Sequence, residues 1–199
     1  MLKKHAPAIL LALMLVALPA QGAVTKYEVD TAHSNVGFMI PILGGLSKVS
    51  GKFNDFTVQI VYDDKDITKS SVTATIKTAS IDTGIERRDA HLRTADFFDA
   101  EKFPEITFQS KRVERKGKQF IAYGTFTMRG VSKEIALPFT LNGVRKDAKS
   151  GKTQMGATAR LSLNRKDFGI NFSRPDNADF LGDVVEIELD LVTKASAAQ

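Results

Sequence analysis

Outside its first 22 residues the chain has two histidines, and these are its candidates for catalysis or metal binding. His33 precedes Ser34, and His91 lies between Asp89 and Asp96, so a hydrolase triad or a mixed histidine–carboxylate metal site could be built from them. No nucleophile elbow accompanies the histidine–serine pair, and neither histidine lies in a cluster with metal-ligand spacing. We therefore expect no catalytic residue, no metal site and no cofactor.

The charges at residues 86–102 could instead bind an anionic group. This charged cluster contains four basic and five acidic side chains. It is interpreted either as a network of ion pairs that braces the fold, because buried charges have to be paired, or as a binding site. In the second interpretation Arg88 or Arg93, with His91, faces a cavity and holds an anionic head group by charge-assisted hydrogen bonds. Both interpretations stay open.

The segment carrying these charges is predicted to be a short helical insert around residues 84–98. Thr83 and Glu86 have the spacing of a capping box at a helix start. Ile85 and Leu92 then fall on one helical face, two turns apart. Pro104 favours extended geometry in the residue before it and marks the return to strand.

Almost everything around this insert alternates between apolar and polar residues with a period of two. Such alternation is typical of antiparallel strands with one dry face and one wet face, and the connections are short and rich in turn residues. Seven or eight such strands bury their dry faces either by stacking two sheets or by closing one sheet into a barrel. The alternation alone does not distinguish the sandwich from the barrel. The clearest runs are residues 56–62, 72–76, 106–108, 120–128, 135–141, 155–163 and 185–191.

The dry faces carry most of the thirteen phenylalanines of a chain that has no tryptophan. These side chains either form a filled core or line a cavity, since the interior of an eight-stranded barrel can be filled by side chains or can hold one small ligand. Small residues such as Ala74, Ala122 and Ala159 on the dry faces favour space inside, which would suit an aliphatic chain. The candidate lining residues are Phe56, Val58, Ile76, Phe97, Phe98, Phe103, Phe108, Phe126, Phe139 and Leu161.

Residues 41–46 read Pro-Ile-Leu-Gly-Gly-Leu and form a short apolar segment. The glycine pair permits backbone conformations that other residues avoid, and the apolar neighbours are costly in open water. We interpret the segment either as an apolar lip at a cavity mouth or as an ordinary hydrophobic corner.

The first 22 residues have the layout of a secretory signal peptide. Lys3 and Lys4 give a positive start, residues 6–18 form an apolar run too short for a normal membrane helix, and small residues follow. We expect cleavage after Gly22 or Ala23, and hence an exported protein.

The remaining chain is predicted to be one domain at residues 23–194 with a disordered tail at residues 195–199. Loss of the two leader lysines lowers the formal charge from +5 to +3. This charge is too mild to indicate a nucleic-acid partner, and no basic run is interleaved with stacking aromatics. The sequence has no cysteine, which excludes disulfides and thiolate chemistry.

Five segments together resemble the YceI family of bacterial periplasmic proteins: residues 27–34, 44–53, 88–99, 103–108 and 165–169. The resemblance runs in order over nearly the whole chain after the leader. It implies a lipocalin-like, eight-stranded antiparallel barrel with an elongated internal pocket for polyisoprenoids or other long amphiphilic lipids. It also implies links to alkaline, acid or osmotic stress and no established enzymatic activity. His33, Arg88, His91 and Arg93 match motif positions, so they are the candidate head-group or rim residues.

The sequence therefore predicts a periplasmic, non-enzymatic carrier of a long-chain lipid held inside the barrel. A filled barrel that acts in structure or stress response through a surface partner is the alternative, and a weak hydrolase using His33 or His91 ranks third. The expected partner is the lipid, with transient membrane contact and a homodimer left open.

Overall fold

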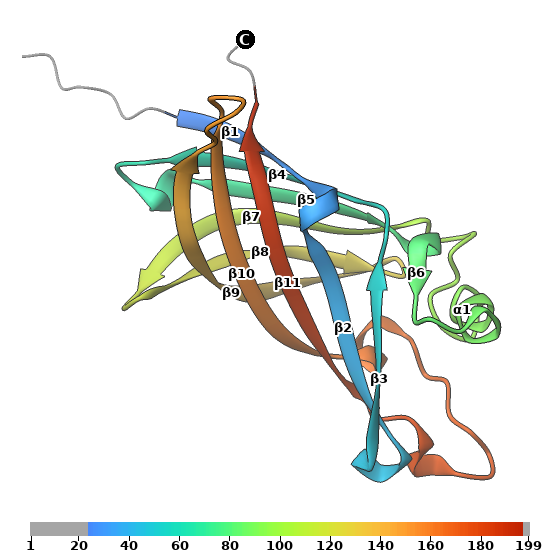
Figure 1. The fold of residues 1–199 in the computed structure, drawn as a ribbon. Helices are drawn as coiled ribbons and strands as arrows, with labels where there is room; N and C mark the ends of the chain where they lie inside the picture. Colours follow the sequence, from blue (N-terminus) through green and yellow to red (C-terminus); the bar gives the residue numbers. More distant parts are fainter. Residues whose placement is uncertain (1–23, 197–199) are drawn as a thin grey trace, which may run out of the picture.

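The computed structural model describes residues 24–196, which form a β structure with one short helix (Figure 1). The predicted leader lies outside the described residues. The strands are β1 (Val24–Val29), β2 (Asn35–Ile42), β3 (Ser47–Phe53), β4 (Phe56–Asp63), β5 (Ser71–Lys77), β6 (Ile81–Asp82), β7 (Glu105–Lys116), β8 (Gln119–Met128), β9 (Val131–Lys146), β10 (Thr153–Asn164) and β11 (Val184–Ala195). The helix is α1 (Glu86–Leu92), and the 3-10 helices are η1 (Thr31–His33), η2 (Leu43–Gly45), η3 (Ile67–Lys69), η4 (Thr78–Ser80), η5 (Arg165–Phe168) and η6 (Ala178–Phe180).

Eight of the strands close into an antiparallel barrel, which confirms the predicted fold class. The order around the ring is β1-β4-β5-β7-β8-β9-β10-β11, and the ring closes where Tyr27 of β1 pairs with Ala195 of β11. β2 pairs with the first half of β11, and β3 and β6 continue the sheet from β2. A closed ring leaves no exposed edge along its paired segments.

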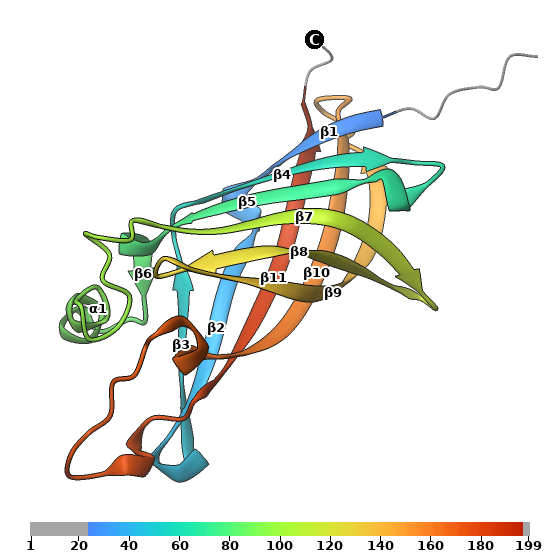
Figure 2. The same ribbon diagram turned by 180° about the vertical axis from the view of Figure 1, so that it is seen from behind.

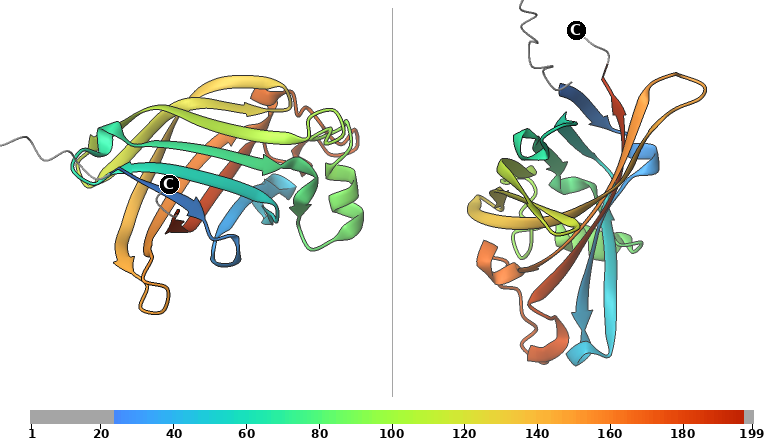
Figure 3. Two further views of the ribbon diagram at one scale, coloured as in Figure 1. Left: turned by 90° about the horizontal axis from the view of Figure 1, so that it is seen from above. Right: turned by 90° about the vertical axis from the view of Figure 1, so that its left-hand side faces the viewer.

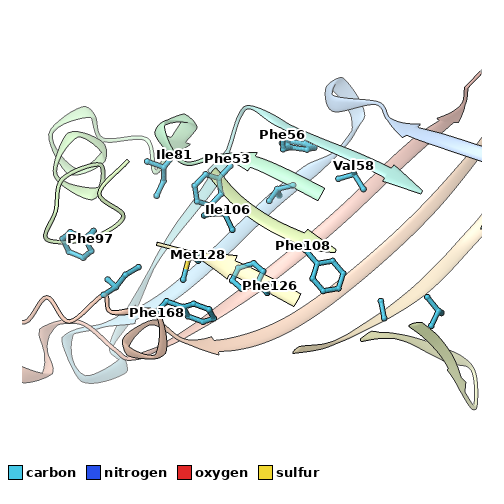
Figure 4. Close-up of a cluster of buried hydrophobic side chains, with 14 of the residues drawn as sticks. Phe53, Phe56, Val58, Ile81, Phe97, Ile106, Phe108, Phe126, Met128 and Phe168 are labelled. Carbon is cyan, nitrogen blue, oxygen red and sulfur yellow. The ribbon is translucent and has the colours of Figure 1, made fainter. Parts of the chain in front are cut away.

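The strand pairings follow the period-two pattern because that pattern puts most apolar side chains of a run on the inner face. Tight turns join the strands where the backbone can take positive φ, as at Gly117 between β7 and β8 and Gly130 between β8 and β9. The buried side chains of several strands form one cluster inside the barrel (Figure 4).

β9 separates from β10 along part of its length. β9 pairs with β8 from Val131 to Phe139, whereas its pairing with β10 begins only at Phe139, opposite Ala159. Pro138 stands where the two strands part, and proline cannot donate to a strand ladder. η5 bridges the separated strands, since Asp167 lies 3.2 Å from Lys133 of β9.

α1 lies in the predicted insert, but its start differs from the predicted capping box. The Asp89 carboxylate, one turn into the helix, accepts hydrogen bonds from the Thr83 N–H at 2.9 Å and the Thr83 hydroxyl at 2.5 Å. Thr83 is therefore held by Asp89 and not by Glu86. Ile85, predicted to share a helical face with Leu92, is instead the extended residue before the helix and is 53% exposed.

α1 and the segment of residues 165–183 lie at the same end of the barrel, as Figures 2 and 3 show from three further directions. At the C-terminus of the chain, Ala195 still belongs to β11, and the Ser196 N–H donates to the Lys26 carbonyl at 2.8 Å. The ordered chain thus extends two residues beyond the predicted boundary, and residues 197–199 lie outside the described part. Among residues 24–196, no helix is long and apolar enough to cross a membrane.

Candidate functional site

The barrel encloses an elongated apolar cavity of about 250 Å³. Seven of the eight ring strands line it, with β2 and β3, and so do residues of α1, η3 and η5. Along β10 the lining runs from Met155 to Leu163, which corresponds to roughly 26 Å at a strand rise of about 3.3 Å per residue. A cavity of about 150 Å³ lined by aliphatic and aromatic side chains stays dry and binds benzene. This cavity is larger and similarly apolar, so a hydrocarbon chain suits it better than water.

Most of the lining residues predicted from the sequence do surround the cavity. The structure places Phe56 and Phe103 outside its lining. Phe56 is buried in the hydrophobic core at the first position of β4. The Phe103 ring lies against the turn at Gly130, 2.7 Å from where a Cβ on that glycine would stand. The eight predicted residues that line the cavity are Val58, Ile76, Phe97, Phe98, Phe108, Phe126, Phe139 and Leu161.

Few lining residues carry a polar side chain, and several of these groups are already bonded. The Ser70 hydroxyl accepts from the Asp63 N–H at 3.0 Å, and the Thr158 hydroxyl donates to the Asn142 side chain at 3.4 Å. Tyr62, Ser71 and Arg165 complete the polar members of the lining. The wall thus offers little to pair with a charged ligand group.

Arg165 is the charged residue among the cavity-lining residues that the sequence reasoning missed. It is only 4% exposed, and its guanidinium donates to the carbonyls of Gly182, Ile170 and Phe172 at 2.8–2.9 Å and to the Asp183 carboxylate at 3.0 Å. Burial lowers the pKa of Arg165, and Asp183 partly opposes this effect. The available signal was positional, since Arg165 continues the inward parity of Met155 through Leu163.

Arg165 therefore acts as a structural brace in this geometry. Four of its five N–H donors are bonded to the segment that leads from η5 to β11. The charge is compensated by Asp183, as a buried cation requires. These bonds fix the segment of residues 165–183, which otherwise has little regular structure, beside the end of the cavity that Arg165 lines.

The predicted head-group arginines contact protein groups and do not line the cavity. Arg88 donates to the Thr83 hydroxyl at 2.6 Å and to the Thr83 carbonyl at 2.8 Å. Arg93 donates to the carbonyls of Ala79 at 2.9 Å and Ile81 at 3.1 Å. These contacts tie α1 and the residue that follows it to residues 79–83 around β6, which is the bracing interpretation of the charged cluster. A role for either arginine in ligand binding stays a prediction.

The two candidate histidines are each paired with a neighbouring aspartate and do not line the cavity. His91 Nε2 lies 2.8 Å from Asp96, and its ring packs edge-on against Phe97 and Phe172 at centroid distances of 5.0 and 5.2 Å. His33, in η1, lies 2.9 Å from Asp30.

Asp30 also accepts from Lys194 of β11, at 2.7 Å. The hydrogen bonds from Lys194 and then His33 hold the pKa of Asp30 below its usual value. Across residues 24–196, no three side chains of metal-ligating type converge.

Arg129 is a second structural arginine that the sequence did not reveal. It lies at the β8–β9 turn with a positive φ of 51°. Its guanidinium donates to the carbonyl of Gly169 and, at 2.7 Å, to that of Ala95, while its Nε is buried without a partner among the described residues. It thereby fastens the loop after α1 and the end of η5 to the barrel.

A closed antiparallel barrel with an elongated, apolar, nearly uncharged interior defines the class of small β-barrels whose interior can hold a hydrophobic molecule. The YceI-like domain family matches residues 27–193, and the chain belongs to this family.

Relatives and solved structures agree with this membership. A UPF0312 protein of Photorhabdus laumondii is 37% identical over 157 residues, which are 79% of this chain and 81% of the relative. The crystal structure of BcnA from Burkholderia cenocepacia is similar with a TM-score of 0.73 at 24% identity, over 82% of this chain and 98% of that one. A polyisoprenoid binding domain from Saccharophagus degradans is similar with a TM-score of 0.66 at 14% identity, over 85% of this chain and 98% of that domain. At these identities the two solved structures show the shared fold.

Proposed function

We propose that this protein binds a long-chain lipid of the polyisoprenoid or fatty-acyl type inside its barrel and carries it through the periplasm without chemical change. The observation that supports this most directly is the elongated apolar cavity. Each buried methylene group contributes about 0.8 kcal/mol, so a chain of about ten such groups would be sequestered strongly. The polyisoprenoid named for the Saccharophagus degradans domain makes a prenyl chain the first ligand to test.

The distribution of polar groups supports a ligand whose buried part is uncharged. Arg165 is the only cation among the lining residues, and protein carbonyls and Asp183 occupy most of its donors. A carboxylate or phosphate inside the cavity would lose its hydration without gaining a partner, which is costly. A charged head group is therefore expected at the cavity end, where Arg88, His91 and Arg93 are the candidates at α1.

Localisation and physiology extend this proposal. Export to the periplasm rests on the signal-peptide pattern of the first 22 residues. A role under alkaline, acid or osmotic stress rests on the family resemblance. Shielding an insoluble chain from water requires no reaction, so we propose binding and not catalysis.

The test is native mass spectrometry of protein purified from its own periplasm without detergent, followed by organic extraction of the bound material. The expected result is a stoichiometric adduct that is identified as a long-chain lipid. A mass equal to the bare protein, with no later uptake of prenyl or acyl lipids, would contradict the proposal. That outcome would leave a surface partner as the basis of function.

A further inference from the structure

The tip of the β2–β3 hairpin is an apolar projection with open space beside its two glycines. Leu46 is 89% exposed and Leu43 is 43% exposed. Between them, Gly44 and Gly45 have φ values of 64° and 91°, and a Cβ added to either glycine would meet no atom within 4 Å. Two leucines presented to water on a glycine-shaped turn are unfavourable for the isolated protein. Such exposure indicates a contact surface.

This hairpin tip lies beside one end of the lipid-sized cavity. Ile42, the last residue of β2, forms a bridge with Leu181, which lines the cavity. The Gly182 N–H donates to the Pro41 carbonyl at 2.9 Å. Figures 1 and 3 show the tip of the β2–β3 hairpin next to η6, and η2 contacts η6. A partner bound at the tip of the β2–β3 hairpin would therefore lie close to that end of the cavity.

The charges described near the tip argue against attachment by anionic lipids. Lys48 is paired with Glu186 at 3.1 Å, and Arg174 with Asp176 at 2.8 Å. Asp179 adds an acid on η6. Because Lys48 and Arg174 already have acidic partners, the tip offers apolar contact without a strong positive field. A zwitterionic bilayer is the surface that matches these properties.

The small size of the projection also separates a bilayer from a protein partner. A stable protein interface buries roughly 800 Å² per partner, far more than two leucines on a hairpin turn supply. A short apolar segment can instead enter the boundary between lipid head groups and acyl chains, where depth of about 5–10 Å is sufficient.

We propose that residues 43–46 insert into the interfacial region of a zwitterionic phospholipid bilayer and bring the adjoining cavity end to the membrane from which the lipid is taken. This inference rests on the proposed function for its purpose, whereas the insertion itself does not depend on which lipid is carried. The water-insoluble chain then passes between bilayer and cavity at the point of contact.

Insertion can be measured with a tryptophan reporter, since the sequence contains no tryptophan. Leu46→Trp is placed in a chain of residues 24–199, which contains every strand of the barrel, and is mixed with phosphatidylcholine vesicles. The emission of this variant is expected to shift to shorter wavelength and to be quenched by brominated acyl chains. Val144→Trp is the matched control, because Val144 is 49% exposed on β9 near the hairpin that joins it to β10.

Equal spectra for Leu46→Trp with and without vesicles would overturn the proposal. A shift that appears without vesicles and grows with protein concentration would also overturn it, in favour of contact between two copies. A shift that occurs only with anionic vesicles and disappears in salt would contradict the zwitterionic partner.

Lipid transfer separates this inference from the proposed function. Leu43→Asp with Leu46→Asp is expected to slow uptake of a fluorescent prenyl lipid from phosphatidylcholine vesicles at least about tenfold, since two exposed leucines no longer bury. Val144→Asp is expected to take up lipid at the wild-type rate. Both variants should bind the same lipid normally when it is added from ethanol. Failure of every form to bind from ethanol would refute the carrier function, whereas an unchanged transfer rate in the tip variant would refute only the docking role.

Discussion

Ala159→Phe should block ligand binding by filling the cavity. Ala159 is buried on the inner face of β10 and lines the cavity. A benzene-sized group needs a cavity of about 150 Å³, so the new ring would take more than half of the 250 Å³ available. Taking for one methylene group the roughly 30 Å³ that a water molecule occupies in the liquid, the ring displaces about five methylene groups of ligand. At about 0.8 kcal/mol for each, the loss is about 4 kcal/mol, or about a thousandfold in affinity.

The assay is equilibrium titration with a fluorescent prenyl lipid, together with urea unfolding of each variant. Ser162→Phe is the matched control, because Ser162 is exposed on the opposite face of the same strand and gains the same ring. The control should bind with wild-type affinity. Wild-type affinity in Ala159→Phe, with stability also unchanged, would refute the conclusion that this cavity holds the ligand.

Three further outcomes concern the stability of the scaffold. Arg165→Met should lower the free energy of unfolding by about 3 kcal/mol or more in urea titrations, because it leaves buried carbonyls and Asp183 without their donor. An unchanged midpoint of the urea unfolding curve would refute the bracing role. Hydrogen bonding from Lys166, and then the charges of Lys166 and Arg165, lowers the pKa of Asp183. The ionised Asp183 carboxylate therefore stabilises the fold above the unfolded-state pKa of about 4, and this contribution is lost as the pH falls through the lower folded value. The stability difference between wild type and Asp183→Asn should therefore be largest at neutral pH and shrink in acid, and a difference that grows in acid would contradict this sign. Gly124→Ala should destabilise the barrel by about 2 kcal/mol or more in the same titrations, because the new Cβ would overlap the Gln109 carbonyl. Gly156→Ala is the control, since its Cβ would meet its nearest atom at an ordinary 3.4 Å. Equal effects of the two substitutions would refute the steric argument.

Much of the cavity lining could be predicted from local pattern because a strand alternates its side chains between two faces. Val58, Phe108 and Leu161 were assigned to the interior on parity alone and line the cavity. Parity also placed Phe56 on the inner face, and it is buried, but at the first position of β4 it packs in the core and does not line the cavity. Arg165 has the same parity as Leu163, but it was not assigned to the interior, because charged residues are rarely buried.

The helical insert shows a second limit of local reasoning. Thr83 and Glu86 have capping-box spacing, yet Asp89 takes both Thr83 donors. The carboxylates of Glu86 and Asp89 are both close enough to Thr83 along the chain to accept its hydrogen bonds. The packing of α1 on β6 decides that Asp89 does so. The bracing contacts of Arg93 with Ala79 and Ile81 depend on that packing too.

The sequence by itself determined seven of the eight ring strands, the position of the insert, the apolar character of the interior and the absence of disulfides, because each follows from residue type and short-range spacing. Only the tertiary structure decided that β1 meets β11 and closes the ring, that η5 bridges β9 and β10, and that the interior keeps about 250 Å³ open. Closure depends on the register of strands far apart in the chain. The open volume depends on how side chains from all those strands pack together, which no single segment specifies.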